Sequence, residues 1–472
     1  MTLVYPERFS QARLAAAVAL TRFGYGARPG EIDRVAGDPA GWLLAQLEDD
    51  SEPTELAGLP QSPTILANSA RAEAAGGETL RRHRQRTLAA QHREAGLHIL
   101  PAIQGRNPYR ERLVRFWAEF FGIGLADPVA APYAHVFERE VIRPNLMRRY
   151  YDMLLAALRH PAMLLKTNNV ASFAKRSPAG RDRQENLATD LARLVLEDYT
   201  LGPGGVAGAT WRGPDLLALA QMFTGWTLVG AEAGPETAAT VRRAPGLPAT
   251  FRFDERLHAE GSKYFLGRNY PAAGVLEAEA ALDTLCRTPA VARRLATLMA
   301  RWFVADDPPD VVVEDLVDGY AQFGGSLGGM ATALATSLPA FEPGLRKLKR
   351  PDDLVISIYR CFDLDPGDGT QVVDAIAALG LGPKDYAAPN AVATSANHWL
   401  EPTRFADRLD WAAAAAVRAR QDAAAGPETG VRLGFELLGP TLSEQTFRRL
   451  AVALDAGESA ALLVLSPEFQ TR

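Results

Sequence analysis

Apolar residues along this chain recur mostly at spacings of three and four, the pattern of amphipathic helices. In PYRERLVRFWAEFFG, residues 108–122, this spacing places Leu113, Phe116, Trp117, Phe120 and Phe121 on one broad face. Glycine and proline punctuate the helical segments. The pattern predicts helices over residues 9–26, 31–49, 108–122, 138–159, 182–201, 214–228, 277–303, 310–323, 327–338, 352–362, 403–425 and 443–465.

One stretch favours strands instead. ATFRFDERLHAEGSKYFLG, residues 249–267, has short runs of alternating β-forming residues around a polar turn, which predicts a small hairpin. Strands and helices do not alternate along the chain as a parallel sheet requires, so a doubly wound fold is not expected. The predicted fold class is mainly α: a large multi-helix assembly with one small β-hairpin near 249–267.

The domain boundaries are weakly marked. We expect a main helical domain over residues 1–345 and a C-terminal helical lobe over 346–472 packed on it. Residues 345–353, LRKLKRPDD, are interpreted as a basic joint that ends at a proline, and residues 230–249 as an exposed insertion. Because no tandem repeat of fixed period is found, a solenoid is not supported.

Composition narrows the range of partners. The 472 residues include 51 basic and 56 acidic side chains, a formal charge of −5, so no global field would hold nucleic acid or an anionic membrane. The basic run at 81–94 is interpreted as the solvated face of a helix, with a polyanion contact as the alternative. No apolar run approaches the roughly eighteen residues that a membrane span needs. The sequence as given predicts a cytoplasmic protein, while a signal peptide removed beforehand remains the alternative.

Two motifs suggest catalysis but have simpler explanations. GGSLG at 324–328 matches the nucleophile pattern of serine hydrolases, and His398 follows in the right order. A strand must lead into such a nucleophile, yet residues 310–323 have helical spacing, so Ser326 is better explained as an N-cap. Gly202 follows a helix and precedes Pro203, which is typical of a C-cap and the wrong order for a phosphate loop.

The histidines and cysteines form no compact metal motif. Cys286 and Cys361 lie far apart without a CxxC pair, which excludes a zinc ribbon or disulfide framework but leaves a single bridge open. No HExxH or similar spacing occurs, so a metal, if any, is unknown and no cofactor is expected. His160, before Pro161, is expected to cap a helix end.

A polar strip on the predicted helix 182–201 is the first candidate site. At about 100° per residue, Asn186, Asp190, Arg193 and Glu197 fall along one edge, with leucines over the rest. One interpretation is a solvent-facing side, on which the charge pairs would add only ~0.3–0.5 kcal/mol each. The other is that neighbouring helices cover the strip and hold Arg193 between carboxylates.

The turn of the predicted hairpin is the second candidate site. His258, Glu260 and Lys263 lie within LHAEGSK, where an imidazole, a carboxylate and an amine could serve acid–base chemistry or hold an anion. A polar turn that is simply hydrated is the alternative interpretation.

Several segments together resemble a bacterial family, domain of unknown function eighteen hundred (DUF1800). They cover nearly the whole chain in the family's order and lie at residues 20–47, 110–122, 142–169, 191–202, 215–228, 251–263, 298–309 and 463–472. The resemblance implies no settled biochemistry. It does imply frequent export, and a protein partner encoded nearby, from an uncharacterised family that resembles sulfatases and alkaline phosphatases.

The family motif NENxARELLELHTLG is only partly kept here. Arg193 and Glu197 are retained, but Asp190 stands at an asparagine position, Leu194 at a glutamate position and Tyr199 at a histidine position.

Two other family motifs also differ in this chain. Phe120 replaces the histidine of W-x-N-H-F. In HD-x-G-x-K, His258 and Lys263 are kept, but Ala259 replaces the aspartate. The resemblance therefore implies a divergent member whose site could keep binding and lose catalysis.

Two hypotheses follow. In the first, the protein binds or assembles with an anionic or polar ligand or partner, through a cleft containing Asn186, Asp190, Arg193, Glu197, His258 and Lys263. In the second, it is a hydrolase-like enzyme with Glu197 as general base and His258 as general acid.

Overall fold

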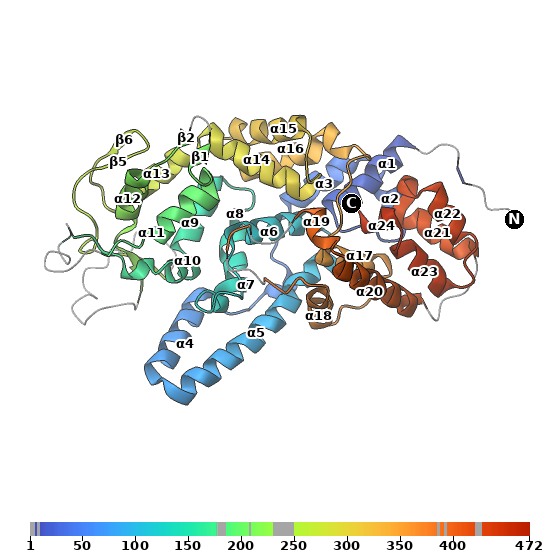
Figure 1. Cartoon of the computed structure of the whole chain (residues 1–472), viewed down its shortest axis with the longest axis horizontal. Coiled ribbons are helices and arrows are strands. Elements are labelled where there is room, and N and C mark those ends of the chain that lie inside the picture. Colours follow the sequence, from blue (N-terminus) through green and yellow to red (C-terminus); the bar gives the residue numbers. More distant parts are fainter. Residues whose placement is uncertain are drawn as a thin grey trace.

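The computed structural model describes residues 5–6, 10–175, 177, 186–206, 209–229, 250–384, 388–390, 394–420 and 427–472. The insertion expected at 230–249 lies outside these residues. Figure 1 shows an elongated molecule built almost entirely of helices, which confirms the mainly α class. Among the described residues, no helix is both long enough and apolar enough to cross a membrane.

The first half of the chain forms the centre and one end of the molecule, except for its first helices, which lie toward the other end (Figure 1). Its helices are α1 (Gln11–Val18), η1 (Ala19–Phe23), α2 (Glu31–Val35), α3 (Pro39–Glu48), η2 (Thr54–Leu56), α4 (Ser62–Ala75), α5 (Gly77–Gln104), α6 (Pro108–Phe121), η3 (Ala131–Tyr133), α7 (Ala134–Phe137), η4 (Glu138–Ile142), α8 (Arg143–Asn145), α9 (Tyr150–Arg159), α10 (Pro161–Lys166), η5 (Asn169–Ala171), α11 (Thr189–Arg193), η6 (Leu194–Thr200) and α12 (Gly213–Phe223). Of these, η1, η4 and η6 are π-helical turns that continue an α-helix.

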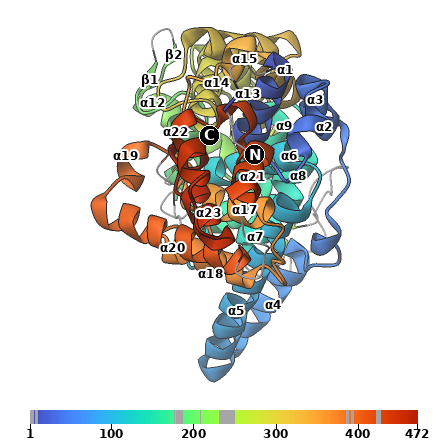
Figure 2. The same ribbon diagram turned by 90° about the vertical axis from the view of Figure 1, so that its right-hand side faces the viewer.

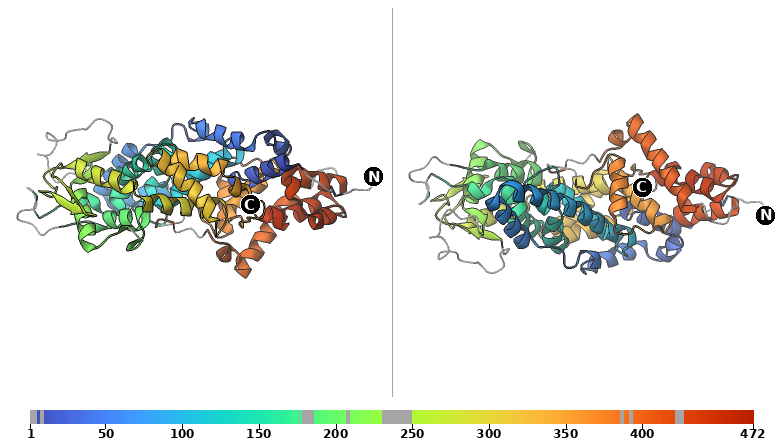
Figure 3. Two further views of the ribbon diagram at one scale, coloured as in Figure 1. Left: turned by 90° about the horizontal axis from the view of Figure 1, so that it is seen from above. Right: turned by 90° about the horizontal axis from the view of Figure 1, so that it is seen from below.

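The second half covers one long side and forms the other end. Its helices are α13 (Val275–Cys286), α14 (Pro289–Phe303), α15 (Asp310–Gln322), α16 (Leu327–Thr336), η8 (Leu338–Phe341), α17 (Pro351–Cys361), α18 (Thr370–Ala378), α19 (Ala396–Trp399), α20 (Pro402–Arg420), α21 (Pro427–Leu438), η9 (Gly439–Thr441), α22 (Glu444–Leu450), α23 (Ala456–Val464) and α24 (Pro467–Gln470). Figure 3 shows α1–α3 beside the C-terminal helices at this end.

The strands form small antiparallel pairs. They are β1 (Gly205–Val206) with β2 (Ala209–Thr210), β3 (Trp226–Leu228) with β4 (Phe251–Phe253), and β5 (Lys263–Phe265) with β6 (Arg268–Tyr270). The expected strands at 249–267 are therefore present as β4 and β5, but they do not pair with each other. β4 pairs with β3, which lies before the 230–249 insertion, and β5 pairs with β6. Local alternation of residues in the sequence does not reveal which strands pair.

Helices α4 and α5 form an antiparallel arm that projects from the body in Figures 1 and 2. The basic run 81–94 lies on α5, and most of its residues are exposed, as a solvated helix face requires. At its base, α5 packs on α17 and α18, which come from the opposite end of the sequence.

Residues that the sequence analysis placed at helix ends also lie at helix ends in the structure. Helix α15, not a strand, leads into Ser326, whose hydroxyl accepts a 3.0 Å hydrogen bond from the Gly329 amide. Ser326 is thus an N-cap, and His398 is exposed on α19. Gly202, with φ +88°, follows η6. His160 ends α9, as expected, but Pro161 then begins α10, and the His160 side chain caps this next helix by accepting a 3.2 Å bond from the Ala162 amide. Both cysteines are buried and free.

The largest hydrophobic core draws on residues 19–340, and a second core draws on residues 354–469. A third cluster joins the two parts of the chain, because it packs Tyr25 and residues from α5 against α17 and α18. The division into 1–345 and 346–472 stays a prediction.

Residues 345–353, interpreted from the sequence as a basic joint, carry charged side chains that are mostly buried. Lys347, Lys349, Arg350, Asp352 and Asp353 are all at most 5% exposed. Residues 347–349 pair with the C-terminal residues: the Lys347 amide donates to the Arg472 carbonyl at 2.9 Å, and the Lys349 amide to the Gln470 carbonyl at 3.0 Å. This basic segment therefore lies between the two cores, where carboxylates and backbone carbonyls satisfy most of its charges.

Candidate functional site

The polar strip is the solvent-facing side of its helix. Arg193 Nη1 lies 3.2 Å from Glu197 Oε1, with side chains 49% and 26% exposed, and Asp190 is exposed. Helix α11 begins only at Thr189, and Asn186 precedes it in a bridge to Phe173. The π-helical turn η6 also changes the residues per turn, so the four positions do not form one continuous line.

His258 and Lys263 belong to a separate, buried network centred on Glu277 of α13. Glu277 Oε2 lies 2.6 Å from Lys263 Nζ and 3.3 Å from His258 Nε2, and all three residues are at most 6% exposed. The other Glu277 oxygen accepts 2.8 and 3.1 Å bonds from the amides of Ala273 and Gly274. The network ties the loop before β5 to α13 rather than opening onto a ligand. Glu260 of the same loop is exposed.

Replacing Glu277 with glutamine should lower stability in a pH-dependent manner. Burial opposes its ionisation, but hydrogen bonds from His258 and Lys263 lower the pKa of Glu277 to about 2. Because the pKa is depressed on folding, this contribution is fully present above the unfolded value of about 4.3 and is lost as the pH falls toward 2. Urea unfolding should show a loss of ~2–4 kcal/mol for E277Q at pH 7 that shrinks at pH 3. A loss of equal size at both pH values would contradict this assignment.

The positions where the resembled family carries histidines lie together in the core here. The rings of Phe120 and Tyr199 are 5.7 Å apart, and both residues are at most 1% exposed. The Tyr199 hydroxyl donates a 2.9 Å bond to the Phe121 carbonyl. An aromatic contact therefore fills the place where two imidazoles would meet, and it offers neither a proton-transfer pair nor a metal ligand set.

A cavity of about 80 Å³ lies elsewhere, between α5, α6, α7, α18 and residues 381–384. One wall is apolar and includes Ile99, Val114, Val373, Ile376 and Leu381. The polar lining consists of Tyr25, His98, Glu111, Arg115, Glu119, His135, Glu138 and Lys384. Within the described ranges, no group of three or more histidine, cysteine, aspartate or glutamate side chains could hold a metal ion.

Two histidines face each other at this cavity but have different surroundings. His98 Nδ1 lies 2.8 Å from Glu138 Oε1, whereas neither ring nitrogen of His135 has a hydrogen-bond partner among the described residues. The two ring centroids are 4.9 Å apart, and His135 is 1% exposed. Burial lowers the pKa of both, that of His135 well below its usual value, so His135 is a neutral imidazole with one free donor and one free acceptor.

The acids of the cavity already have partners. Both Glu111 oxygens accept from Arg143 at 2.9 and 2.7 Å, and both Glu119 oxygens accept from Arg350 at 2.9 and 2.7 Å. Glu138 Oε2 accepts a 3.0 Å bond from Lys384, and although burial opposes its ionisation, His98 and Lys384 lower the pKa of Glu138 well below its usual range.

Arg115 is ion-paired through its Nε, but its two terminal guanidinium nitrogens remain available as donors. Its Nε lies 2.9 Å from Asp352 Oδ2, and its side chain is 28% exposed. The end groups of Arg115 make no side-chain hydrogen bond within the described residues. Burial would lower the pKa of Arg115, but Asp352 raises it, so the guanidinium is charged. The free hydrogen-bonding capacity of the cavity therefore consists mainly of donors.

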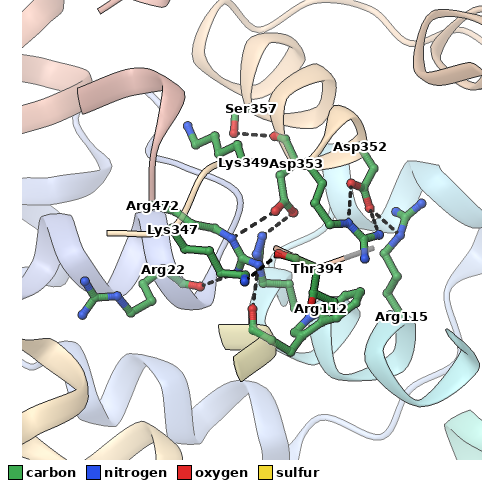
Figure 4. Close-up of polar contacts among 12 residues, drawn as sticks. Arg22, Arg112, Arg115, Lys347, Lys349, Asp352, Asp353, Ser357, Thr394 and Arg472 are labelled. Atoms are coloured by element: carbon green, nitrogen blue, oxygen red, sulfur yellow. Dashed lines mark hydrogen bonds and ion pairs between the residues drawn. The ribbon is translucent and has the colours of Figure 1, made fainter. Parts of the chain in front are cut away.

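Arg115 also connects the cavity to the ion network between the two cores (Figure 4). Asp352 pairs with Arg115 and Arg350, and Asp353 pairs with Arg112 and with Arg472 Nε at 3.0 Å. Arg472 in turn donates a 2.7 Å bond to the Trp302 carbonyl. This network holds α6, α17 and the C-terminal residue in one arrangement and fixes the Arg115 side of the cavity.

Sequence patterns did not point to His98, His135, Glu138 or Lys384. His98 lies four residues after Glu94 on α5, which could have suggested a polar face, but nothing local marks His135 as unpaired. Its cavity also needs residues 373–384, some 240 positions downstream, so only the tertiary structure identifies it.

The model of a family described as protein of unknown function (DUF1800) matches residues 18–471. No curated protein and no solved structure matches the chain.

Proposed function

Because the chain belongs to the DUF1800 family, whose function is unknown, we propose a function from its own geometry: it is a binding protein whose cavity between α5, α6 and α7 takes a small anionic ligand. The observation that carries the proposal is His135, a buried imidazole with both ring nitrogens unpaired in the described structure. A buried polar group without a partner costs about 1–3 kcal/mol, so a ligand that bonds to this ring recovers free energy that the empty protein lacks.

The donors and acceptors around the cavity favour an anion. The oxygens of Glu111, Glu119 and Glu138 are taken by Arg143, Arg350, His98 and Lys384, while the end groups of Arg115 remain free to donate. A carboxylate or another small oxyanion supplies acceptors for the terminal guanidinium nitrogens of Arg115 and for the ring N–H of His135. The apolar wall of Ile99 and Val373 would then accommodate a short aliphatic part of the ligand.

The volume limits the ligand to a few heavy atoms. A dry cavity of about 150 Å³ holds a benzene molecule, and this cavity is about half that size. Acetate, butyrate and inorganic phosphate are therefore suitable probes of different length and charge.

Binding of these three probes by isothermal titration calorimetry tests the proposal. We expect the wild type to bind at least one of them, and His135→Phe to weaken that affinity by about tenfold or more. Phenylalanine occupies a similar volume without polar atoms, so the variant should be as stable as the wild type or more stable. His92→Phe, at a side chain that is 44% exposed on the same helix as His98, should leave binding unchanged.

Two outcomes would contradict the proposal. The first is a wild type that binds none of the probes, and the second is a His135→Phe variant that binds with unchanged affinity. Thermal unfolding of each variant distinguishes lost binding from lost folding.

The contact between Phe120 and Tyr199 supports a binding role over catalysis, because it leaves no imidazole at these two positions. No contact in the described part of the chain favours Glu197 and His258 as an acid–base pair, since Glu197 pairs with Arg193 and His258 with Glu277. The partner from the sulfatase-like family stays a prediction.

A further inference from the structure

A second, larger cavity lies on the other side of the Glu111–Arg143–Glu138 ion network. Its volume is about 1090 Å³, and it runs between residues 50–63 and the surface of η4, α8 and α9. Arg143 lines this groove, while its partners Glu111 and Glu138 line the small cavity, so the two spaces share a charged wall.

The segment 50–63, which covers one side of the groove, is held by hydrogen bonds near both of its ends. The Ser62 amide and hydroxyl donate 2.9 and 2.6 Å bonds to Glu140, and Arg139 Nη2 donates to the Pro60 carbonyl at 2.5 Å. At the other end, Asn107 Nδ2 donates to Asp49 at 2.5 Å. These hydrogen bonds fix the position of the segment and therefore define the shape of the groove.

Arg110 is a largely buried arginine of the groove that has few hydrogen-bond partners. It is 7% exposed, and in the described part of the chain no carboxylate lies within ion-pair distance of it. Its single hydrogen bond is a long one, 3.3 Å from Nη1 to the Leu47 carbonyl. Burial lowers the pKa of Arg110, while the nearby carboxylates of Glu111, Asp49 and Asp50 oppose this shift. A largely buried guanidinium that makes no direct ion pair is costly, so an anionic group of a ligand would complete this site.

The other arginines of the groove divide into paired and available ones. Arg139 bonds to Glu94 and Pro60, and Arg143 bonds to Glu111 and Glu138. Arg148, in contrast, is exposed, and its side chain makes no hydrogen bond or ion pair among the described residues. Arg110 and Arg148 are thus the two arginines of the groove that form no ion pair within the described residues. The acids of the lining are Glu140, which accepts from Ser62, and Asp50 and Glu52, which are exposed.

We propose that this groove binds a short peptide segment carrying acidic side chains. Its volume slightly exceeds the roughly 300–1,000 Å³ of small-molecule pockets, which suits several residues better than one small anion. Carboxylates of the peptide would pair with Arg110 and Arg148. Apolar side chains would lie against Leu56, Val141 and Met147, which also line the groove.

Fluorescence anisotropy with a labelled peptide tests this inference. The probe is fluorescein-Glu-Leu-Glu-Leu-Glu, with the matched Gln-Leu-Gln-Leu-Gln peptide and citrate as comparisons. We expect the Glu peptide to bind at least tenfold more tightly than the Gln peptide and to be displaced poorly by citrate. Arg110→Gln and Arg148→Gln should each weaken its affinity about fivefold or more.

The controls separate the site from general charge effects. Arg86→Gln removes an exposed arginine on the α5 arm and should leave the affinity unchanged. Because Arg148 is exposed, its replacement leaves the fold intact even if Arg110→Gln unfolds the protein. His135→Phe should not change peptide binding, so failure of the small cavity as a ligand site is distinguishable from failure of the groove.

Three results would overturn the inference. They are no binding of the Glu peptide, equal binding by Arg148→Gln, and citrate or phosphate binding as tightly as the peptide, which would indicate a site for a small anion.

Discussion

Replacing Arg350 with methionine is expected to lower the free energy of unfolding by about 3–5 kcal/mol, because two buried carboxylates lose a shared counter-ion. Arg350 is 1% exposed, and it donates to both oxygens of Glu119 and to Asp352 at 3.2 and 2.8 Å. Its guanidinium also lies 4.2 Å from the centre of the Trp302 ring. Methionine keeps part of the packing but none of the charge.

Urea unfolding of Arg350→Met beside Arg293→Met measures this effect. Arg293 pairs with Glu314 at 2.6 Å, but their side chains are 55% and 52% exposed, so that pair should contribute at most ~1 kcal/mol. Equal losses for the two variants would mean that the junction network adds no more to stability than a surface ion pair does.

Replacing Lys349 with methionine is expected to have the opposite effect and stabilise the protein. Lys349 is 2% exposed, and its ammonium group makes no hydrogen bond or ion pair in the described structure. The group lies 4.1 Å from the centre of the Phe469 ring. Burial lowers the pKa of Lys349 to about 7. A flexible apolar side chain of similar length removes the cost of burying the amine.

The sign of the pH dependence follows from this shift. In the unfolded chain lysine titrates near pH 10.4, so between about pH 7 and pH 10 the unfolded state holds a proton that the folded state has released. Wild-type stability should therefore rise through this range. At and below pH 7 the penalty is fully present, and Lys349→Met should gain ~2–4 kcal/mol.

Lys347→Met is the matched control for Lys349→Met. Lys347 lies two residues away and is equally buried, but it pairs with Asp306 and donates a 2.7 Å bond to the Thr394 carbonyl. Its replacement should destabilise the protein. If both lysine variants lost stability, Lys349 would have a partner that this account does not recognise.

Features that depend on a few neighbouring residues could be predicted from the sequence. The apolar face of α6 is buried at Leu113, Phe116 and Phe120, as the helical spacing indicated. Ser326 and His160 cap helices, because a cap involves residues only two or three positions apart.

Features that depend on distant contacts could not be predicted. Arg350 meets Glu119 across 231 positions, so the segment LRKLKRPDD could be interpreted as a basic joint, but the burial of its charges could not be foreseen. The strip at Arg193 was ambiguous for a related reason. An amphipathic pattern alone does not say whether a neighbouring element covers the polar face, and here none makes it a pocket.

The candidate cavity could not be predicted from the sequence either, because it too depends on contacts between distant residues. His135 becomes notable only when its neighbours are known, since its significance is that neither ring nitrogen has a partner among the residues that the structure describes. Lys384 and Arg115, which define the polar end with it, come from segments 269 positions apart in the numbering.

Native mass spectrometry of the protein in the presence of the tightest-binding small anion tests the central claim most directly. The account predicts one bound anion per wild-type chain and none on His135→Phe, while His92→Phe keeps the anion. Equal occupancy in wild type and His135→Phe, or none in either, would contradict the assignment of this cavity as the ligand site.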